Sequence, residues 1–207
     1  MAQALWGAAA IGYPDGMMKM LRTMAVRSFG KLCPGSRTGI KLASFMATPS
    51  QDPAKQHHAQ VVENWASAVW TPDMPWEQVE AAFVGSLRKL AAAANPWQVA
   101  AGPAAVYLMV LQRLGWYPVS FREVIVHNGL HIKLLELAPK ALRPLAHEAT
   151  QRWSDFQDTA STGLGTPPFA IFWPALAPLL RGPCKRHGWT LRHLQALRYI
   201  LAGGEWN

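Results

Sequence analysis

The sequence predicts a mainly α-helical fold with one β-hairpin, at about residues 122–135. Apolar residues recur at three- and four-residue spacing along most of the chain, between proline and glycine breaks, which is the pattern of successive amphipathic helices. Period-two alternation around a turn dipeptide occurs in VIVHNGLHIKL, residues 124–134, and indicates two short strands. Half of the 207 residues are apolar and 15% are charged, so we expect a buried core rather than disorder.

Two of the first three predicted helices have proline at their starts. PDGMMKMLRTMAVRSFG begins at Pro14 and stops at Gly30, and RTGIKLASFMAT follows it as a short second helix. The longer of the two is expected to bury an apolar stripe of five residues, namely Met17, Met20, Leu21, Met24 and Phe29. Asp52 is the predicted N-cap of the next helix, with Pro53 at its first position, and its buried edge is expected at Val61, Trp65 and Val69.

Two further helices complete the predicted core. MPWEQVEAAFVGSLRKLAAAA is broken by Asn95 and Pro96, and its expected core face consists of Trp76, Val79, Phe83, Leu87, Leu90 and Ala94. The helix from Pro103 to Leu114 is apolar on all sides, which predicts a central position in the fold. This apolar run is shorter than the roughly 20 residues that span a bilayer, so we expect no membrane partner.

The predicted hairpin turns at Asn128–Gly129, a dipeptide that favours a two-residue type I′ turn because both positions need a positive φ. In that register Ile125 pairs with Ile132, and His127 and His131 point to opposite faces. The face expected to lie on the helices consists of Ile125, His127, Leu130, Ile132 and Leu134. The basic face, expected to meet solvent or phosphate, consists of Arg122, Val124, Val126, His131 and Lys133. A three-residue turn, which would place the two histidines opposite each other, is the alternative.

The C-terminal part is predicted to be less continuous. APKALRPLAHEATQRWSDFQDTAS is helical with Pro144 near its start or at a kink, and TGLGTPPFAIFWP is a candidate linker because it is rich in glycine and proline. The last helix has Thr190 as its N-cap and stops at Gly203–Gly204. We therefore predict a helical domain with the hairpin at 1–160, a linker at 161–172 and a short helical segment at 173–207 that packs on the domain.

The net charge of +8 is concentrated at the two ends of the chain. Residues 1–50 contain six Lys and Arg and one acid, and residues 181–207 contain five Lys and Arg and one acid. The sequence between them contains nine Lys and Arg and ten acids. Basic segments bind phosphate backbones, because each Lys or Arg releases condensed counterions. The predicted nucleic-acid-binding residues are Lys19, Arg22, Arg27, Lys31, Arg37, Lys41, Lys133, Lys185, Arg186, Arg192 and Arg198. The alternative is that these charges only keep solvated helix faces soluble.

No motif in the sequence predicts catalysis. There is no G-x-S-x-G nucleophile elbow, no D-x-D carboxylate pair and no H-E-x-x-H zinc site. Cys184, His187 and His193 lie within ten residues but are one ligand short of a structural zinc site. We therefore expect neither an enzyme nor a metal or cofactor. A site assembled from dispersed residues, with His127, His147 or His187 against a carboxylate, is left open.

The cysteines indicate where the protein is found. Cys33 and Cys184 are the only two, they lie far apart, and they form no disulfide framework. This favours a reducing compartment and therefore an intracellular location, nuclear or cytoplasmic. The first 48 residues hold a single acid, so an organellar transit peptide is the alternative interpretation of this end.

Four stretches of the chain together resemble a known family. They are ALWGAAAIGYPDGMMKMLRTMAVRSFG, the DPA before ENWASAVW, NPWQVAAGPAAVYLMVLQRLGW, and LRYILAGGEW. They resemble the thumb and connector region downstream of the reverse-transcriptase domain in protist LINE-like (non-LTR) retrotransposon polyproteins. The motifs are structural Trp, Gly and Pro signatures, and the chain lacks the family's Y-x-D-D polymerase motif, Cys/His knuckle and ribonuclease H acids. The resemblance therefore implies a fragment or degenerate copy of such a polyprotein, with no catalytic residue to carry over.

Charge and resemblance together predict a non-catalytic helical module that binds a template–primer or an RNA backbone. The expected ligand is RNA or an RNA/DNA hybrid, and phosphate contacts alone give no sequence preference. The alternative is a helical protein-interaction or assembly module in which some of the ten tryptophans are exposed interface anchors. The two hypotheses differ in whether basic residues or tryptophans cluster on the folded surface. The sequence predicts no oligomeric state.

Overall fold

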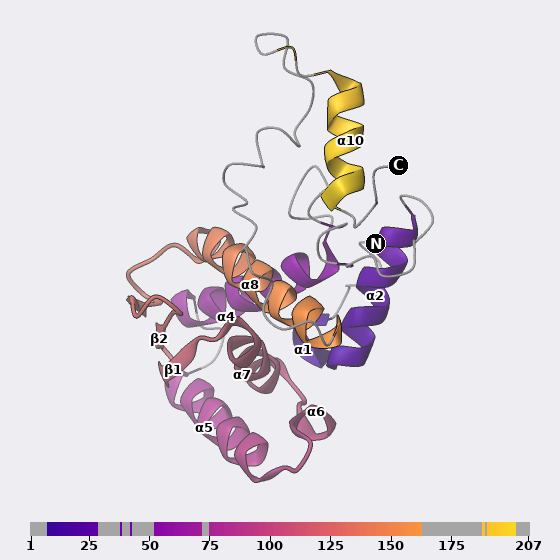
Figure 1. The fold of residues 1–207 in the computed structure, drawn as a ribbon. Helices are drawn as coiled ribbons and strands as arrows, with labels where there is room; N and C mark the ends of the chain where they lie inside the picture. The colour runs from indigo at the N-terminus through magenta and orange to yellow at the C-terminus, as the bar shows by residue number, and fades with distance from the viewer. Residues whose placement is uncertain are drawn as a thin grey trace. The chain divides into compact units, whose positions relative to one another are not determined.

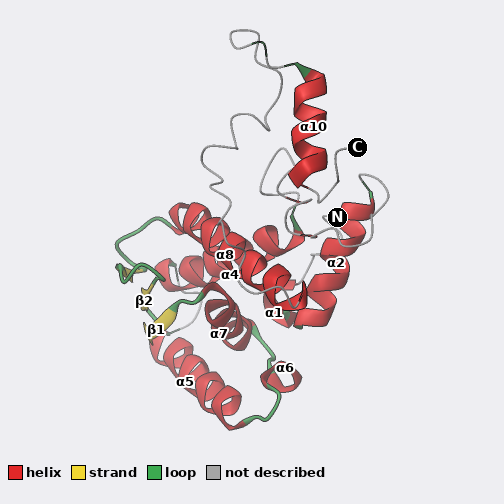
Figure 2. Cartoon of the chain, viewed as in Figure 1, coloured by secondary structure: helices red, strands yellow, loops and turns green. Residues whose placement is uncertain are grey.

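The computed structural model describes residues 8–28, 38, 42, 52–71, 75–162, 188 and 190–201, and these residues are mainly helical (Figure 1). The helices are α1 (Ala8–Ile11), α2 (Asp15–Arg27), α4 (Pro53–Trp70), α5 (Trp76–Ala92), α6 (Pro96–Val99), α7 (Pro103–Leu114), the 3₁₀ helix η3 (Pro139–Ala141), α8 (Leu142–Thr162) and α10 (Leu191–Leu201). Between α7 and η3 lies an antiparallel sheet of β1 (Tyr117–Ser120), β2 (Glu123–Ile125) and β3 (His131–Lys133) (Figure 2). The predicted fold class, mainly α with a small β element, is confirmed.

The chain divides into two compact units. Unit 1 consists of Met1–Met18 and Pro53–Trp153, and unit 2 consists of Lys19–Asp52 and Ser154–Asn207. The division falls inside α2 and α8. The domain boundaries expected from the sequence stay a prediction, and most of the expected linker at 161–172 lies outside the described residues. The short helix expected at residues 37–48 also lies outside them, apart from Thr38 and Leu42. In the part of the chain that is described, no helix is long and apolar enough to cross a membrane.

Helix α7 is the centre of unit 1, as its all-round apolar sequence predicts. Every residue from Ala104 to Leu111 is buried, and α7 contacts α1, α4, α5 and β1. The Tyr107 ring stacks on Trp65 of α4, with ring centroids 5.0 Å apart and planes 13° apart. Trp65 Nε1 donates a hydrogen bond to the carbonyl oxygen of Phe121 at 3.0 Å, which satisfies the polar atom of a buried indole.

Of the helices that pack against α7, α4 and α5 were predicted with different success. The expected buried edge of α4, namely Val61, Trp65 and Val69, is confirmed. In α5 the inner residues are buried as expected, namely Val79, Phe83 and Leu90. Trp76 and Leu87 of the same expected face are exposed, as is Ala94 beyond the helix end, so the predicted core face of α5 was too wide.

The hairpin forms where it was predicted, but its register differs by one residue. Val124 pairs with Ile132 and Ile125 with His131, and the loop is the three residues His127–Gly129. The cause is Asn128: in the described residues only glycines have a positive φ, so a type I′ turn is excluded and Gly129 alone, at φ 81°, closes the loop. Asn128 Oδ1 instead accepts a hydrogen bond from the Leu130 amide at 3.0 Å.

The shift turns the first strand over, because side chains alternate along a strand. The prediction that Ile125 and His127 face the helices was therefore wrong, and the buried residues are Val124, Val126, Ile132 and Leu134. In the second strand Ile132 and Leu134 are buried as predicted, and His131 and Lys133 point outward. Leu130, which was also predicted to face the helices, is 52% exposed. The strand β1, which pairs with β2, was not predicted at all.

Helix α2 also presents a different face from the predicted one. Its buried residues are Met18, Arg22, Ala25 and Val26. The expected core stripe is instead exposed, at 44% for Met17, 53% for Met20 and 58% for Met24, while Leu21 is half-buried and Phe29 lies outside the described residues. The prediction of this stripe as core was wrong, because apolar residues occupy both sides of the helix and a polar contact of Arg22 selects between them.

Candidate nucleic-acid interface

The positive charge of the chain belongs almost entirely to one of the two units. Unit 2 holds eleven Lys and Arg and four Asp and Glu, a net charge of +7. Unit 1 holds nine Lys and Arg and eight Asp and Glu, a net charge of +1. The cations of both basic ends, which are far apart in sequence, thus belong to the same compact unit.

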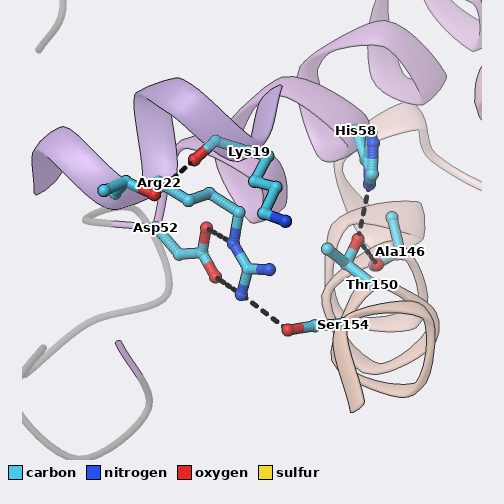
Figure 3. A network of polar contacts seen from close by, with 8 residues as sticks. Lys19, Arg22, Asp52, His58, Ala146, Thr150 and Ser154 are labelled. Carbon is cyan, nitrogen blue, oxygen red and sulfur yellow. Dashed lines mark hydrogen bonds and ion pairs between the residues drawn. The ribbon is translucent and has the colours of Figure 1, made fainter. Parts of the chain in front are cut away.

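One predicted cation, Arg22, is buried at 4% exposure and forms an internal ion pair. Its Nε and Nη2 atoms each lie 3.2 Å from a different carboxylate oxygen of Asp52, and Nη2 also donates to Ser154 Oγ at 2.6 Å (Figure 3). This two-point geometry matches the fork of the guanidinium to the carboxylate. Arg22 therefore presents no donor face to a phosphate, and its contacts join the first segment of unit 2 to α8.

Three other predicted cations lie in the described part of unit 2 with their side chains at the surface. Lys19 and Arg27 are exposed on α2, and Arg192 is exposed on α10. Lys19 and Arg27 are eight residues apart, which is about 12 Å along a helix. Both side chains are long enough to reach the backbone of one nucleic-acid strand.

The remaining predicted cations of the basic ends have side chains that lie outside the described residues. Arg198 lies on α10, but its side chain is outside the described residues. The others lie outside them entirely, namely Lys31, Arg37, Lys41, Lys185 and Arg186. Their part in binding stays a prediction from the sequence.

Two carboxylates lie beside the bases of the predicted basic face of the hairpin. Lys133 is exposed, with Nζ 3.1 Å from Glu136 Oε1, and it pairs across the sheet with Glu123. The hydrogen bond and charge of Glu136 raise the pKa of Lys133 above its usual value, and the charge of Glu123 acts in the same direction. His131 Nε2 lies 3.2 Å from Glu123 Oε2 on this face. Two carboxylates beside one lysine weaken its attraction for phosphate.

Exposed aromatic residues surround the same sheet. Trp70 and Trp76 are 43% and 38% exposed, at the end of α4 and the start of α5. The indole of Trp70 donates to the carbonyl oxygen of Leu134, and the Arg122 guanidinium lies 3.8 Å from the ring centroid of Trp76. Tyr117 on the edge strand β1 is 69% exposed. The sequence offered exposed tryptophans as an alternative but did not locate them at this surface, since Trp76 fell on the expected core face.

A buried polar cluster in unit 1 is centred on two neighbouring histidines of α4. His57 and His58 are 2% and 0% exposed, with ring centroids 5.7 Å apart. The Thr150 hydroxyl donates to the Ala146 carbonyl oxygen, so it accepts the 3.0 Å hydrogen bond from His58 Nδ1 (Figure 3).

Of the histidines considered for a dispersed enzyme site, His127 lies near a carboxylate in the described residues. His127 Nε2 lies 4.0 Å from Glu148 Oε1, but Glu148 is also 2.7 Å from Arg152. Burial and the charge of Arg152 lower the pKa of His127, with Glu148 acting in the opposite direction. His187 lies outside the described residues, and no group of three potential metal ligands occurs within them.

Comparison of the chain with protein-family models, curated proteins and solved structures found no match. The resemblance to the LINE-like polyproteins therefore stays a prediction that depends on the sequence motifs alone.

Proposed function

We propose that this chain is a non-catalytic helical module that binds RNA or an RNA/DNA hybrid through the phosphate backbone, without sequence preference. The observation that carries the proposal is the charge of unit 2, with eleven Lys and Arg against four Asp and Glu. Each cation that neutralises a phosphate releases condensed counterions, and this contribution is independent of the base sequence. The resemblance to the thumb and connector of LINE-like polyproteins supports the same class of ligand.

The described residues that support binding are Lys19, Arg27 and Arg192, all exposed. Arg22 is left out, because its guanidinium is buried against Asp52. Lys133 contributes less, because Glu136 and Glu123 lie beside it. Binding is therefore expected to depend on unit 2 more than on the sheet of unit 1.

The test is a salt titration of binding to a fluorescently labelled single-stranded RNA and to a primer–template duplex, followed by anisotropy. Replacing Lys19 and Arg27 together by glutamine should weaken binding and reduce the slope of log K against log salt by about 1.4 to 1.8, for two lost phosphate contacts. The matched control replaces Arg88 and Lys89, two exposed cations at the end of α5 in unit 1, by glutamine. This control changes the net charge equally and should leave the slope close to that of the unmodified chain.

Two results would contradict the proposal. One is the absence of binding at low salt, and the other is binding that does not respond to salt. Equal effects of the unit 1 and unit 2 variants would mean that total charge, rather than unit 2, determines binding.

A second candidate function, a protein-interaction or assembly module, is favoured by the exposed Trp70, Trp76 and Tyr117 around the sheet. Tryptophan, tyrosine and arginine are the residues that most often dominate binding energy at interfaces. Sedimentation over a range of protein concentrations tests self-assembly. Association that Trp70→Ser and Tyr117→Ser each reduce would support this function, and a monomer at all concentrations would argue against assembly through these residues.

A further inference from the structure

Helix α2 has a second apolar face that points away from its buried side. The inner side is fixed by Met18, Ala25 and Val26, with Arg22 between them. On the opposite side Met17, Met20 and Met24 follow one another at spacings of three and four residues, so they form one stripe along the helix. All three are 44% or more exposed. A solvent-exposed helix face normally carries polar residues at these positions.

Methionine is suited to a binding surface of this kind. Its unbranched side chain and polarisable sulfur adapt to different partner shapes, and methionine-rich surfaces are used for this purpose by promiscuous binders. Single exposed apolar residues are normal on a protein surface, but a continuous stripe has an apolar area that a partner can cover.

The charges beside the stripe indicate the charge of that partner. Arg27 lies three residues after Met24 and is therefore next to it on the helix surface. Lys19 lies on the same side of the stripe as Arg27, about 100° around the helix from Met20, and both cations are exposed. The acid of this helix, Asp15, is engaged by Arg113, whose Nε and Nη2 atoms lie 2.8 and 2.6 Å from Asp15 Oδ1. The exposed stripe is therefore bordered by positive charge, and the complementary partner is acidic.

We propose that this face of α2, consisting of Met17, Met20 and Met24 with Lys19 and Arg27, docks an acidic amphipathic helix of a partner protein. From Met17 to Met24 the stripe extends about 10 Å, or two helical turns, which matches apolar anchors at i, i+3 or i+4, and i+7 on an apposed helix. Acidic residues flanking those anchors pair with the two cations. Nucleic acid does not explain the methionines, since a phosphate backbone offers them no apolar surface.

A designed peptide tests the proposal directly. The probe is a fluorescein-labelled helical peptide with leucines at i, i+3, i+4 and i+7 and glutamates on both flanks, and its binding to the full chain is measured by anisotropy. Two control peptides are used, one with a scrambled sequence and one with lysines in place of the glutamates. The acidic peptide should bind, and the scrambled and basic peptides should bind at least about tenfold more weakly, because they lose the apolar register or the charge match.

Paired variants locate the site on the chain. Met20→Gln with Met24→Gln keeps side-chain length but removes apolar contact, and should weaken peptide binding by roughly tenfold or more. The matched control is Leu87→Gln with Val99→Gln, two apolar residues of α5 and α6 that are 44% and 42% exposed, and it should leave binding unchanged. No binding of the acidic peptide, or binding that the methionine pair does not affect, would overturn the proposal. Methionine-dependent binding to phosphatidylserine-containing vesicles without peptide binding would also overturn it, in favour of a lipid surface.

This inference goes beyond the proposed nucleic-acid binding but uses two of the same cations. The methionine variant should retain RNA binding, whereas replacing Lys19 and Arg27 by glutamine should weaken the binding of both ligands. Peptide binding without RNA binding would therefore overturn the proposed function alone, and RNA binding without peptide binding would overturn this inference alone.

Discussion

Lowering the pH should destabilise this protein through His57. The effect should begin at pH values well above those at which most carboxylates titrate. The imidazole is 2% exposed, its ring centroid lies 5.1 Å from that of Tyr13, and the Arg113 guanidinium is near it. Neither ring nitrogen has a hydrogen-bond partner in the described structure. Burial, and secondarily the positive charge of Arg113, lower the pKa of His57 from 6.5 to about 3. The folded protein therefore keeps this imidazole neutral where the unfolded chain protonates it.

The size of the effect follows from proton linkage. Because the folded-state pKa lies below the unfolded value of 6.5, the stabilisation is fully present above pH 6.5 and is lost as the pH falls toward 3. Each pH unit in that window costs about 1.4 kcal/mol, so the free energy of unfolding should fall by about 2 kcal/mol between pH 7.5 and pH 5. That is a large share of the roughly 5–15 kcal/mol that stabilises a typical domain.

Urea unfolding at pH 7.5 and pH 5, followed by circular dichroism, measures the effect. His57→Leu removes the titrating group. Between the two pH values, the free energy of unfolding of this variant should therefore fall by about 2 kcal/mol less than that of the unmodified chain. Val69→Ala, at a buried and non-titrating position of the same helix, controls for the loss of buried contacts and should leave the pH dependence of the unmodified chain in place. Equal losses in the His57→Leu and unmodified proteins, or an NMR titration of the His57 ring with a midpoint near 6.5, would refute the reasoning.

Three further predictions concern the contacts of α1, α2 and α7. Asp52→Asn removes the carboxylate charge that pairs with the buried Arg22 guanidinium and should lower the free energy of unfolding by about 3–5 kcal/mol in urea titrations. Gly12→Ala should lower the free energy of unfolding more than Gly115→Ala. Both glycines have a positive φ, and the backbone strain of a non-glycine residue there is about 1–3 kcal/mol. At Gly12 the new Cβ would also lie 2.9 Å from Trp97 Cζ3, whereas at Gly115 it would meet no atom within 4 Å. In timed peroxide oxidation followed by mass spectrometry, the exposed methionines should react before the buried ones, with Met17, Met20 and Met24 preceding Met18 and Met109.

Sequence periodicity predicted the fold well where one side of an element is apolar and the other polar. In α4, Val61, Trp65 and Val69 recur at a spacing of four, and all three are buried. In the hairpin, Val124, Ile125 and Val126 are all apolar, so alternation in the first strand carries no information about which residues face the core. The register was decided by the backbone of Asn128, which does not adopt the positive φ that its preference for type I′ turns suggested.

The candidate site was predictable in its overall charge but not in its individual residues. Counting Lys and Arg along the chain identified the two basic ends, because net charge is a property of composition. The sequence could not show that Arg22 is buried, since its partner Asp52 is thirty residues away and Ser154 is 132 residues away. For the same reason the exposure of Trp70 and Trp76 was not predictable: it depends on how α4 and α5 end against the sheet.

The burial of Arg22 does not weaken the case for nucleic-acid binding, because the ion pair with Asp52 is neutral as a whole. The net charge of +7 in unit 2 already includes both members of the pair, so it belongs to the other ten cations and three acids. Long-range attraction for a polyanion depends on that net charge, whereas the buried pair depends on close geometry. Substitutions of Arg22 would therefore report on the folding of unit 2, and only substitutions of exposed cations such as Lys19 and Arg27 report on binding.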